Sequence, residues 1–284
     1  MVIEKFSILR LLSPGCKMNK KYALETNYLG IDMGSTGIKI VCIDDDANLL
    51  WSQSFPSNPL NIKYVESKGF MRNTDCTIAA VCSTGYGRKK INWADCAVTE
   101  ISCQAKGISI LDPDCKTIID IGGQDTKIIS IVNSQLARFS MNDKCAAGTG
   151  RFIEKAAATL GCTLEEMSEI RMCKEAILPI DSTCTTFAET EIISLIAEGR
   201  DVLQITNSLY YALARRIANM VRIFGLTDHI VLTGGLATHR KLIKWLEQFL
   251  DCQIKIPEEP RFSAAYGAAV ISRDLLRRKS QQCE

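Results

Sequence analysis

The feature that most constrains the fold of this chain is an internal repeat. Residues 28–43, YLGIDMGSTGIKIVCI, align with residues 116–131, KTIIDIGGQDTKIISI, at a constant offset of 88 residues. An aspartate, a glycine and a lysine recur at matching positions: Asp32 with Asp120, Gly34 with Gly122, and Lys39 with Lys127. In each copy, apolar and β-branched residues flank a polar turn that contains glycine, which is the pattern of a β-hairpin. The repeat therefore predicts two duplicated domains, each with its own hairpin.

A hairpin used twice predicts two domains that face each other across a cleft, with phosphate groups bound between the two turns. Glycine lets the main chain approach an anion closely and lets successive N–H groups converge on it. The residues expected to bind phosphate are Gly34, Ser35, Thr36 and Lys39 in the first copy, and Gly122, Gly123, Gln124, Asp125 and Lys127 in the second. Asp32 and Asp120 are expected to hold Mg²⁺ through water, because a carboxylate in direct contact with phosphate would be repelled. Taken alone, each turn also fits an ordinary hairpin.

A third segment supports nucleotide binding. Residues 229–250, HIVLTGGLATHRKLIKWLEQFL, predict a buried strand, a turn at Gly234 and Gly235, and an amphipathic helix. The backbone of such a turn suits a position under an adenine ring or a ribose. The chain then continues as FSAAYGAAVISRDLLRR, a predicted helix rich in small residues that permits close packing.

Length and composition set broad limits on the function. A chain of 284 residues predicts two domains, and a net charge of +2 gives no electrostatic reason to bind nucleic acid or an anionic membrane. The longest apolar runs fall short of the roughly 20 residues that cross a bilayer. The sequence thus predicts a soluble cytoplasmic protein. Residues 1–26 are expected to form a disordered extension, and Met18 is an alternative to Met1 as the start.

The thirteen cysteines are expected to be reduced thiols of a cytosolic protein, since no secretion signal accompanies them. No two of them form a C-x-x-C pair, and most are expected to be small core residues. His229 and His239 are the only histidines, so neither a histidine metal triad nor a Ser-His-Asp triad is predicted.

Several motifs resemble a known family. The order D-x-G-S-T, D-I-G-G-Q-D-T-K and T-G-G resembles the acetate and sugar kinase, heat-shock ATPase and actin superfamily. Within it, NDKCAAGTGRF, STCTTFAETEIISL and TGYGRKKI…TEIS resemble the activator ATPases of 2-hydroxyacyl-CoA dehydratases and the ATPase subunits of benzoyl-CoA reductases. The likeness covers about residues 28–275. It implies an α/β fold with two duplicated ribonuclease H-like domains of the actin and sugar kinase superfamily facing a nucleotide cleft.

The resemblance also sets expected domain boundaries. Residues 27–112 are expected to form the first domain, completed by the C-terminal helix 263–284, and residues 113–262 the second domain. The second domain would carry Cys145 and Cys184.

Cys145 and Cys184 are the predicted cluster ligands. Each precedes a predicted helix with a C-terminal glycine, Gly161 or Gly199. A helix N-terminus favours bound negative charge, but a 4Fe-4S cluster needs four thiolates. A two-fold axis supplies the second pair, and the family resemblance implies the same arrangement: one cluster bridging a homodimer. Four shared cysteines also suit zinc, and spacing alone is compatible with two structural thiols.

The resemblance implies a mechanism as well. ATP binding and hydrolysis would drive a low-potential electron to an iron-sulfur dehydratase or reductase, with a ferredoxin or flavodoxin as donor, in an oxygen-sensitive protein of anaerobic metabolism. Glu100 is expected to position the attacking water, or else to act as a helix-cap glutamate, and Gln124 to contact the terminal phosphate. Gln104 and His239 depart from the residues common at these positions in the family.

Two other function classes fit parts of the pattern. A small-molecule kinase acting on a sugar or a carboxylate would use the same fold without needing Cys145. An interaction module switched by nucleotide would bind ATP with negligible turnover and no metal. The iron content of the protein separates both classes from an activator.

Overall fold

The structure is a computed structural model that describes residues 26–73, 77–143, 145–173, 177–180, 185–225 and 228–282. Cys184 and residues 1–25, nearly all of the expected N-terminal extension, lie outside the described residues. The chain forms two compact units, Met1–Gly107 with Phe262–Glu284 and Ile108–Arg261. The domain boundaries expected from the sequence stay a prediction.

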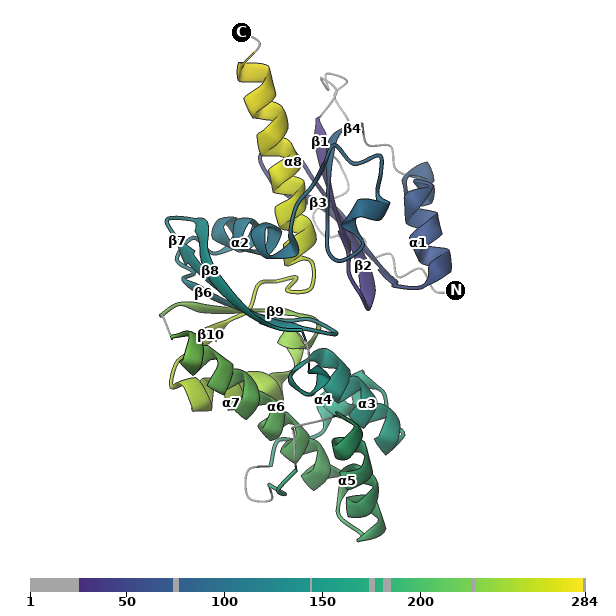
Figure 1. Ribbon diagram of the computed structural model, residues 1–284, viewed down its shortest axis with the longest axis vertical. Helices are drawn as coiled ribbons and strands as arrows, with labels where there is room; N and C mark the ends of the chain where they lie inside the picture. The colour runs from purple at the N-terminus through teal and green to yellow at the C-terminus, as the bar shows by residue number, and fades with distance from the viewer. Residues whose placement is uncertain are drawn as a thin grey trace, which may run out of the picture. The chain divides into compact units, whose positions relative to one another are not determined.

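The first unit is built on a five-stranded mixed sheet with the strand order β3-β2-β1-β4-β5 (Figure 1). The strands are β1 (Asn27–Met33), β2 (Gly37–Ile43), β3 (Leu49–Pro56), β4 (Ile78–Thr84) and β5 (Cys96–Ala97). The first three strands form an antiparallel meander, whereas β4 pairs parallel with both β1 and β5. The predicted hairpin at residues 28–43 is therefore confirmed as β1 and β2.

Helices cover both faces of this sheet. The helical segments are α1 (Pro59–Glu66), η1 (Gly69–Asn73), η2 (Arg88–Lys90), most of α2 (Glu100–Leu111), and α8 (Ser263–Gln281). Alternate residues of β1 face opposite ways. Leu29 and Ile31 join the buried cluster that contains Val65 of α1, while Gly30 lies against the backbone of α8 at Ala265. Figure 1 shows α1 and α8 on opposite sides of the strands.

The second unit repeats the sheet, in the order β10-β9-β6-β7-β8. The strands are β6 (Thr117–Ile121), β7 (Thr126–Val132), β8 (Gln135–Asn142), β9 (Ile230–Gly234) and β10 (Ile254–Lys255). As in the first unit, three antiparallel strands are joined by two parallel ones. Each strand of the first sheet thus has a counterpart in the second, and the predicted α/β fold with duplicated domains is confirmed.

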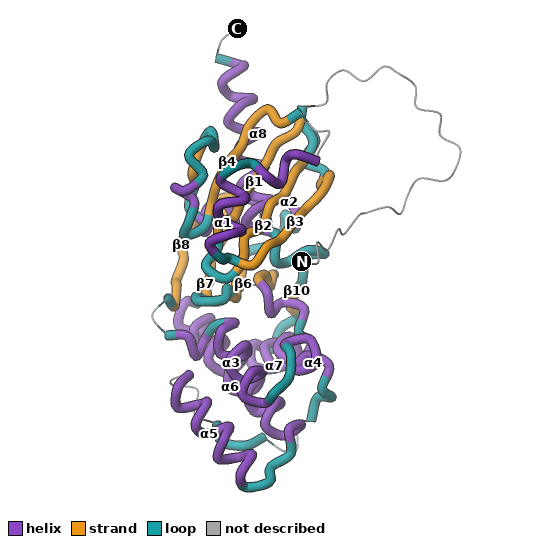
Figure 2. The backbone as a smooth tube through the Cα atoms, turned by 90° about the vertical axis from the view of Figure 1, so that its right-hand side faces the viewer, coloured by secondary structure: helices purple, strands orange, loops and turns teal. Residues whose placement is uncertain are grey.

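The helices of the second unit pack on one face of its sheet (Figures 1 and 2). They are η3 (Ala146–Gly148), α3 (Gly150–Leu160), α4 (Leu164–Glu169), α5 (Thr185–Ala197), α6 (Val202–Phe224), η4 (Gly235–Thr238) and α7 (Arg240–Leu250). Ile119, Ile121 and Ile128 of the sheet join Leu209 and Leu213 of α6 in one buried cluster. None of the helices within the described ranges combines the length and the apolar composition needed to span a membrane.

Several local predictions are confirmed. Helix α3 ends at Gly161, which adopts a left-handed conformation with φ 71°. Residues 229–250 form strand β9, a glycine turn and helix α7, with the short 3-10 helix η4 inserted after the strand. Glycine in the left-handed region ends helices without the strain that a Cβ would add.

The contact of Gly30 with α8 gives a stability prediction. A Cβ at position 30 would collide with the carbonyl oxygen of Ala265 and the amide of Ala269, so we expect Gly30→Ala to lower the free energy of unfolding by about 1–3 kcal/mol. Chemical denaturation measures this loss. The matched control is Gly37→Ala in β2, where the nearest atoms to a new Cβ lie at 3.6 Å, an ordinary contact. Equal stability of the two variants would contradict the prediction.

Candidate functional site

In the first unit, polar residues surround the turn between β1 and β2. Asp32 lies opposite Lys39 in the strand register, and the distance from Lys39 Nζ to Asp32 Oδ2 is 3.1 Å. Only glycine fits at position 34, because a Cβ there would lie 2.7 Å from the Gly37 carbonyl oxygen. A carboxylate and an ammonium group therefore flank a tight backbone turn.

The second unit repeats this arrangement in a more buried form. Asp120 lies opposite Lys127, whose Nζ is 3.4 Å from Asp120 Oδ2 and 2.7 Å from Asp125 Oδ1. The Lys127 side chain is only 2% exposed. A buried ammonium group requires charged or polar partners, and two carboxylates supply them here. A Cβ at Gly122 would collide with Asp125 Oδ1, so glycine allows Asp125 to turn back toward Lys127.

The two copies differ at the carboxylate that ends the first strand. In the second unit, Asp120 Oδ1 accepts a hydrogen bond of 2.8 Å from Thr233 Oγ1. Thr84 occupies the equivalent register position beside Asp32, but its hydroxyl donates to the Val98 carbonyl at 2.9 Å. Asp32 Oδ1 is buried and has no hydrogen-bond partner among the described residues. Such an orphaned carboxylate oxygen fits a bound cation, and carboxylates are ligands that Mg²⁺ uses.

Glycines with positive φ shape the ends of the parallel strands. Gly234 has φ 95°, and a Cβ there would collide with the Ile121 carbonyl oxygen. Gly85 has φ 84°, and a Cβ there would lie 2.5 Å from Asp32 Oδ1. Gly85 thus allows the backbone after β4 to pack directly against Met33 and the orphaned oxygen. It was not among the residues predicted from the sequence, although the Thr-Gly pair that it shares with residues 233–234 was a signal that could have identified it.

The start of helix α3 is attached to the β6–β7 turn. The Gly150 amide donates to the Gly122 carbonyl and the Arg151 amide to the Gly123 carbonyl, both at 2.9 Å. Thr149 Oγ1 lies 3.0 Å from the same Gly123 oxygen. The glycine turn that was predicted to bind phosphate is therefore hydrogen-bonded to the first turn of a helix.

Cys145 lies just before this helix. It is half-buried at the start of η3, and its carbonyl oxygen accepts a hydrogen bond of 3.0 Å from Asn142 Nδ2 at the end of β8. The Gly148 carbonyl accepts a hydrogen bond from Thr126 Oγ1 of β7. The Cys145 carbonyl and the backbone three residues after it are thus hydrogen-bonded to strands β8 and β7.

Cys184 lies outside the described residues, but it directly precedes α5 in the sequence. Helix α5 packs against α3, and Lys155 Nζ of α3 lies 3.7 Å from Glu189 Oε2 of α5. Within the part of the chain that the structure describes, no three His, Cys, Asp or Glu side chains gather as a metal site. The described half of the predicted cluster site therefore consists of Cys145.

The structure brings the predicted residues together within each unit. The first unit holds Asp32, Gly34, Ser35, Thr36 and Lys39, and the second holds Asp120, Gly122, Gly123, Gln124, Asp125, Lys127, Gly234 and Gly235. Gln124 is exposed at its turn. Glu100 begins α2, two residues after Val98, whose carbonyl binds Thr84. Glu100 thus follows closely on the segment held at the end of β4.

Comparison with known proteins decides the family. Residues 29–272 match the BadF/BadG/BcrA/BcrD ATPase family. The chain belongs to this family. It is 36% identical to the activator of lactoyl-CoA dehydratase of Anaerotignum propionicum, over 88% of this chain and 99% of that one. It is 35% identical to the (R)-2-hydroxyglutaryl-CoA dehydratase activating ATPase of Acidaminococcus fermentans, over 86% of this chain and 96% of that one.

A solved structure of the same kind supports the assignment. The activator of 2-hydroxyisocaproyl-CoA dehydratase from Clostridium difficile, with bound ADPNP, matches with a TM-score of 0.82 and 32% identity, over 90% of this chain and 97% of that one. The resemblance to the dehydratase activators inferred from the motifs is therefore confirmed, and this member of the ATPase family has their fold.

Beside the Gly234 turn, this ATPase has a buried polar network. The Tyr210 hydroxyl lies 2.6 Å from His239 Nδ1, where His239 precedes α7. Burial lowers the pKa of His239 to about 4, with a smaller contribution from the nearby Lys241 ammonium. His239 is therefore neutral near pH 7, and its Nδ1 shares a hydrogen bond with the Tyr210 hydroxyl. Lys241 Nζ binds three backbone carbonyls at the end of α4, those of Met167, Ser168 and Ile170.

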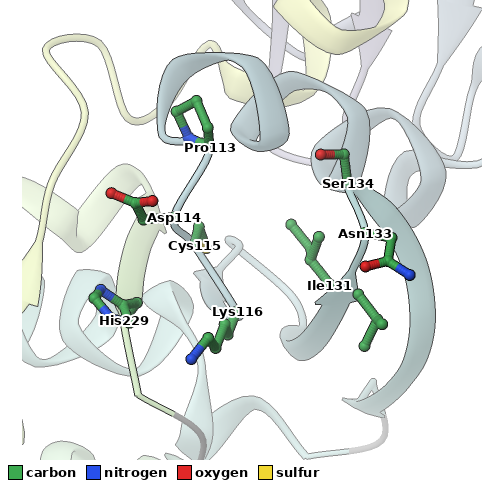
Figure 3. Close-up of a pocket in the computed structure, with 9 residues that line it drawn as sticks. Pro113, Asp114, Cys115, Lys116, Ile131, Asn133, Ser134 and His229 are labelled. Atoms are coloured by element: carbon green, nitrogen blue, oxygen red, sulfur yellow. The ribbon is translucent and has the colours of Figure 1, made fainter.

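A pocket of about 530 Å³ lies at the other end of β6 (Figure 3). Its lining includes Cys115 and Lys116 before the strand, Asn133 and Ser134 in the β7–β8 turn, and His229 before β9. None of the predicted site residues lines it. The chemistry predicted from the repeat therefore concentrates at the glycine turns and not at this pocket.

The difference between the two aspartates predicts different effects of the same substitution. We expect Asp120→Asn to lower the free energy of unfolding by about 3 kcal/mol, because it removes a charge that balances buried Lys127. Asp32→Asn should cost less than about 1 kcal/mol, since Lys39 reaches solvent.

We expect Asp32→Asn, and not Asp120→Asn, to abolish the additional rise in melting temperature that Mg²⁺ gives to the ATP-bound protein. If thermal-shift assays show that Asp120→Asn loses this Mg²⁺ effect and Asp32→Asn keeps it, Asp32 is not the Mg²⁺ ligand.

The His239 site predicts a pH dependence. Its pKa of about 4 in the folded protein lies below the ordinary value of 6.5. Between these values the unfolded chain binds more protons, so stability falls as the pH drops from about 6.5 toward 4, by up to about 3 kcal/mol from this residue. Denaturation at a series of pH values should show a smaller fall in His239→Asn. A slope in His239→Asn equal to that of the unaltered protein would contradict the prediction.

Proposed function

We propose that the chain is an ATP-dependent activator that delivers a low-potential electron to a 2-hydroxyacyl-CoA dehydratase or to a benzoyl-CoA reductase-like protein. It acts as a homodimer bridged by one 4Fe-4S cluster. The names of its relatives support the activator role. The observation that carries the proposal is the set of hydrogen bonds from residues 149–151 to the carbonyls of Gly122 and Gly123.

These hydrogen bonds supply a route from nucleotide to cysteine. A nucleotide changes a protein only if it binds one conformation more tightly than another. A shift of the Gly122–Gly123 turn on binding or losing the terminal phosphate displaces the acceptors of the first turn of α3. Since Cys145 stands four residues before Thr149, the same shift reaches the cysteine.

Cys145 and Cys184 of two subunits together provide the four thiolates that a 4Fe-4S cluster requires. The half-buried Cys145, whose neighbouring backbone is bound to β7 and β8, fits a ligand that must be held in place. When bound, the cluster supplies one-electron transfer. Raising one electron by 100 mV costs about 2.3 kcal/mol, a step that ATP hydrolysis can drive.

The nucleotide is bound by the strand-end residues. Asp32 would hold Mg²⁺ through its orphaned oxygen. The backbone of the Gly34–Thr36 and Gly122–Asp125 turns and the Lys39 amine would contact phosphate, and Gly234–Gly235 would support the ribose or adenine. Lys127, which is buried and paired with Asp120 and Asp125, would hold the second turn in place. Glu100 positions the attacking water and Gln124 contacts the terminal phosphate. A ferredoxin or flavodoxin in the cytoplasm supplies the electron.

Iron and sulfide analysis of protein purified without oxygen tests the proposal. We expect one 4Fe-4S cluster per dimer, with a visible and EPR signal that air bleaches. Cys145→Ser and Cys184→Ser should each lose the cluster, because each removes two of the four shared ligands. Cys252→Ser is the matched control, since Cys252 is another half-buried cysteine of the same unit and lies outside any disulfide.

Other results of the iron and sulfide analysis would favour other functions. An iron-free protein that cannot be reconstituted would remove electron transfer and favour a kinase, to be checked by ATP turnover stimulated by sugars or carboxylates. Zinc without sulfide would leave an ATPase with a structural metal. Iron retained in Cys145→Ser would show that other cysteines hold the cluster.

A further inference from the structure

Three cysteines of the first unit form a cluster away from the glycine turns. Cys82 lies within β4, Cys96 begins β5, and Cys103 lies in α2; together with Ala268 of α8 they form one small core. Cys82 and Cys103 are fully buried, whereas Cys96 is half-buried and reaches the surface. The function proposed above uses none of the three.

The strand register brings two of these thiols together. Cys82 and Cys96 are directly paired residues of the parallel strands β4 and β5. Side chains of paired residues project from the same face of a sheet, and adjacent strands lie about 4.8 Å apart. This spacing falls within the range of about 4.4–6.8 Å between Cα atoms that a disulfide bond spans. Both residues are free thiols in the structure.

The two thiols have different acidities. A hydrogen bond from Cys82 is the largest cause that lowers the pKa of Cys96, and Lys279 of α8 contributes; burial and Asp95 oppose them. The pKa of Cys82 is raised, first by its hydrogen bond with Cys103, then by that with Cys96, and then by burial. Cys96 is therefore the more acidic thiol of the pair. The thiolate is the reactive form of cysteine, and Cys96 is also the member that solvent reaches.

We propose that Cys96 and Cys82 are a redox-active dithiol, a modification site at which a hydroperoxide converts the pair into a reversible cross-strand disulfide. The Cys96 sulfur attacks one peroxide oxygen, the O–O bond breaks, and the leaving hydroxide takes up a proton to become water, which leaves a sulfenic acid on Cys96. The Cys82 sulfur then attacks the Cys96 sulfur, and the S–O bond breaks. The Cys82 proton leaves with the hydroxide as a second water. Two thiols are oxidised and one hydrogen peroxide is reduced to two waters.

The position of the bond gives it a consequence. Cys82 stands two residues before Thr84, and the Thr84 hydroxyl binds the carbonyl of Val98, two residues after Cys96. A disulfide would add a covalent link beside this hydrogen bond, immediately before Glu100 at the start of α2. It would hold β5 against β4 at the end of the strands where Asp32 lies. The proposal does not depend on the identity of the cluster at Cys145.

Peptide mapping of the full-length chain tests the site directly. Protein purified without oxygen is treated with one equivalent of hydrogen peroxide, the remaining thiols are alkylated, and the protein is digested. Trypsin places Cys82 together with Cys76 in residues 73–88, and both Cys96 and Cys103 in residues 91–106. Fragmentation of the linked peptide between Cys76 and Cys82 identifies which of the two is bonded. Additional cleavage after Glu100 separates Cys96 from Cys103. We expect a Cys82–Cys96 linked pair that disappears on treatment with dithiothreitol.

Controls separate this reaction from general oxidation. Cys96→Ser should abolish the link, whereas Cys103→Ala should retain it. Without peroxide, Cys96 should be alkylated at least about tenfold faster than Cys252, whose pKa is raised by burial and by nearby carboxylates. A link from Cys82 to Cys103, no link at all, or equal alkylation of Cys96 and Cys252 would each overturn the proposal. The mapping of the unaltered chain is decisive even where a variant fails to fold.

Discussion

The cross-strand pairing of aspartate with lysine is the constraint on which both halves of this ATPase depend. A tight glycine turn fixes the register of each hairpin, and the register places a carboxylate opposite an ammonium group at the strand end. Charges withdrawn from water must be paired, because an unpaired buried charge costs several kcal/mol. The paired groups therefore stay beside the turn backbone, where the N–H groups of glycine turns can meet an anion.

The repeat contains two such hairpins, and they differ in the hydrogen bond that one threonine makes. Thr233 donates a hydrogen bond to Asp120, and two carboxylates lie beside Lys127, so the charged groups of the second copy are buried and paired with one another. Thr84 donates instead to the Val98 carbonyl, and Asp32 Oδ1 has no hydrogen-bond partner among the described residues. The same fold thus supports a structural ion cluster in one unit and a candidate metal ligand in the other.

The sequence predicted the elements whose signals are local. The repeat, the Asp, Gly and Lys positions, the strand and helix at residues 229–250 and the glycine at the end of α3 all follow from spacing within short segments. It did not predict features that depend on residues distant in the chain. The contact of Thr149 with Gly123 joins residues 26 positions apart, and the pairing of Cys82 with Cys96 depends on a parallel register that no turn specifies.

These long-range contacts are the physical basis of the proposed coupling between the nucleotide and Cys145. If the first amides of a helix were bonded to a flexible loop, the loop could move without shifting the helix. In this protein the first amides of α3 are satisfied by the β6–β7 turn itself, so the turn cannot change its carbonyl directions without breaking those bonds or moving the helix. Helix-end amides left without partners are costly, and the helix therefore follows the turn. The packing of α3 against α5 extends this dependence to the helix that follows Cys184.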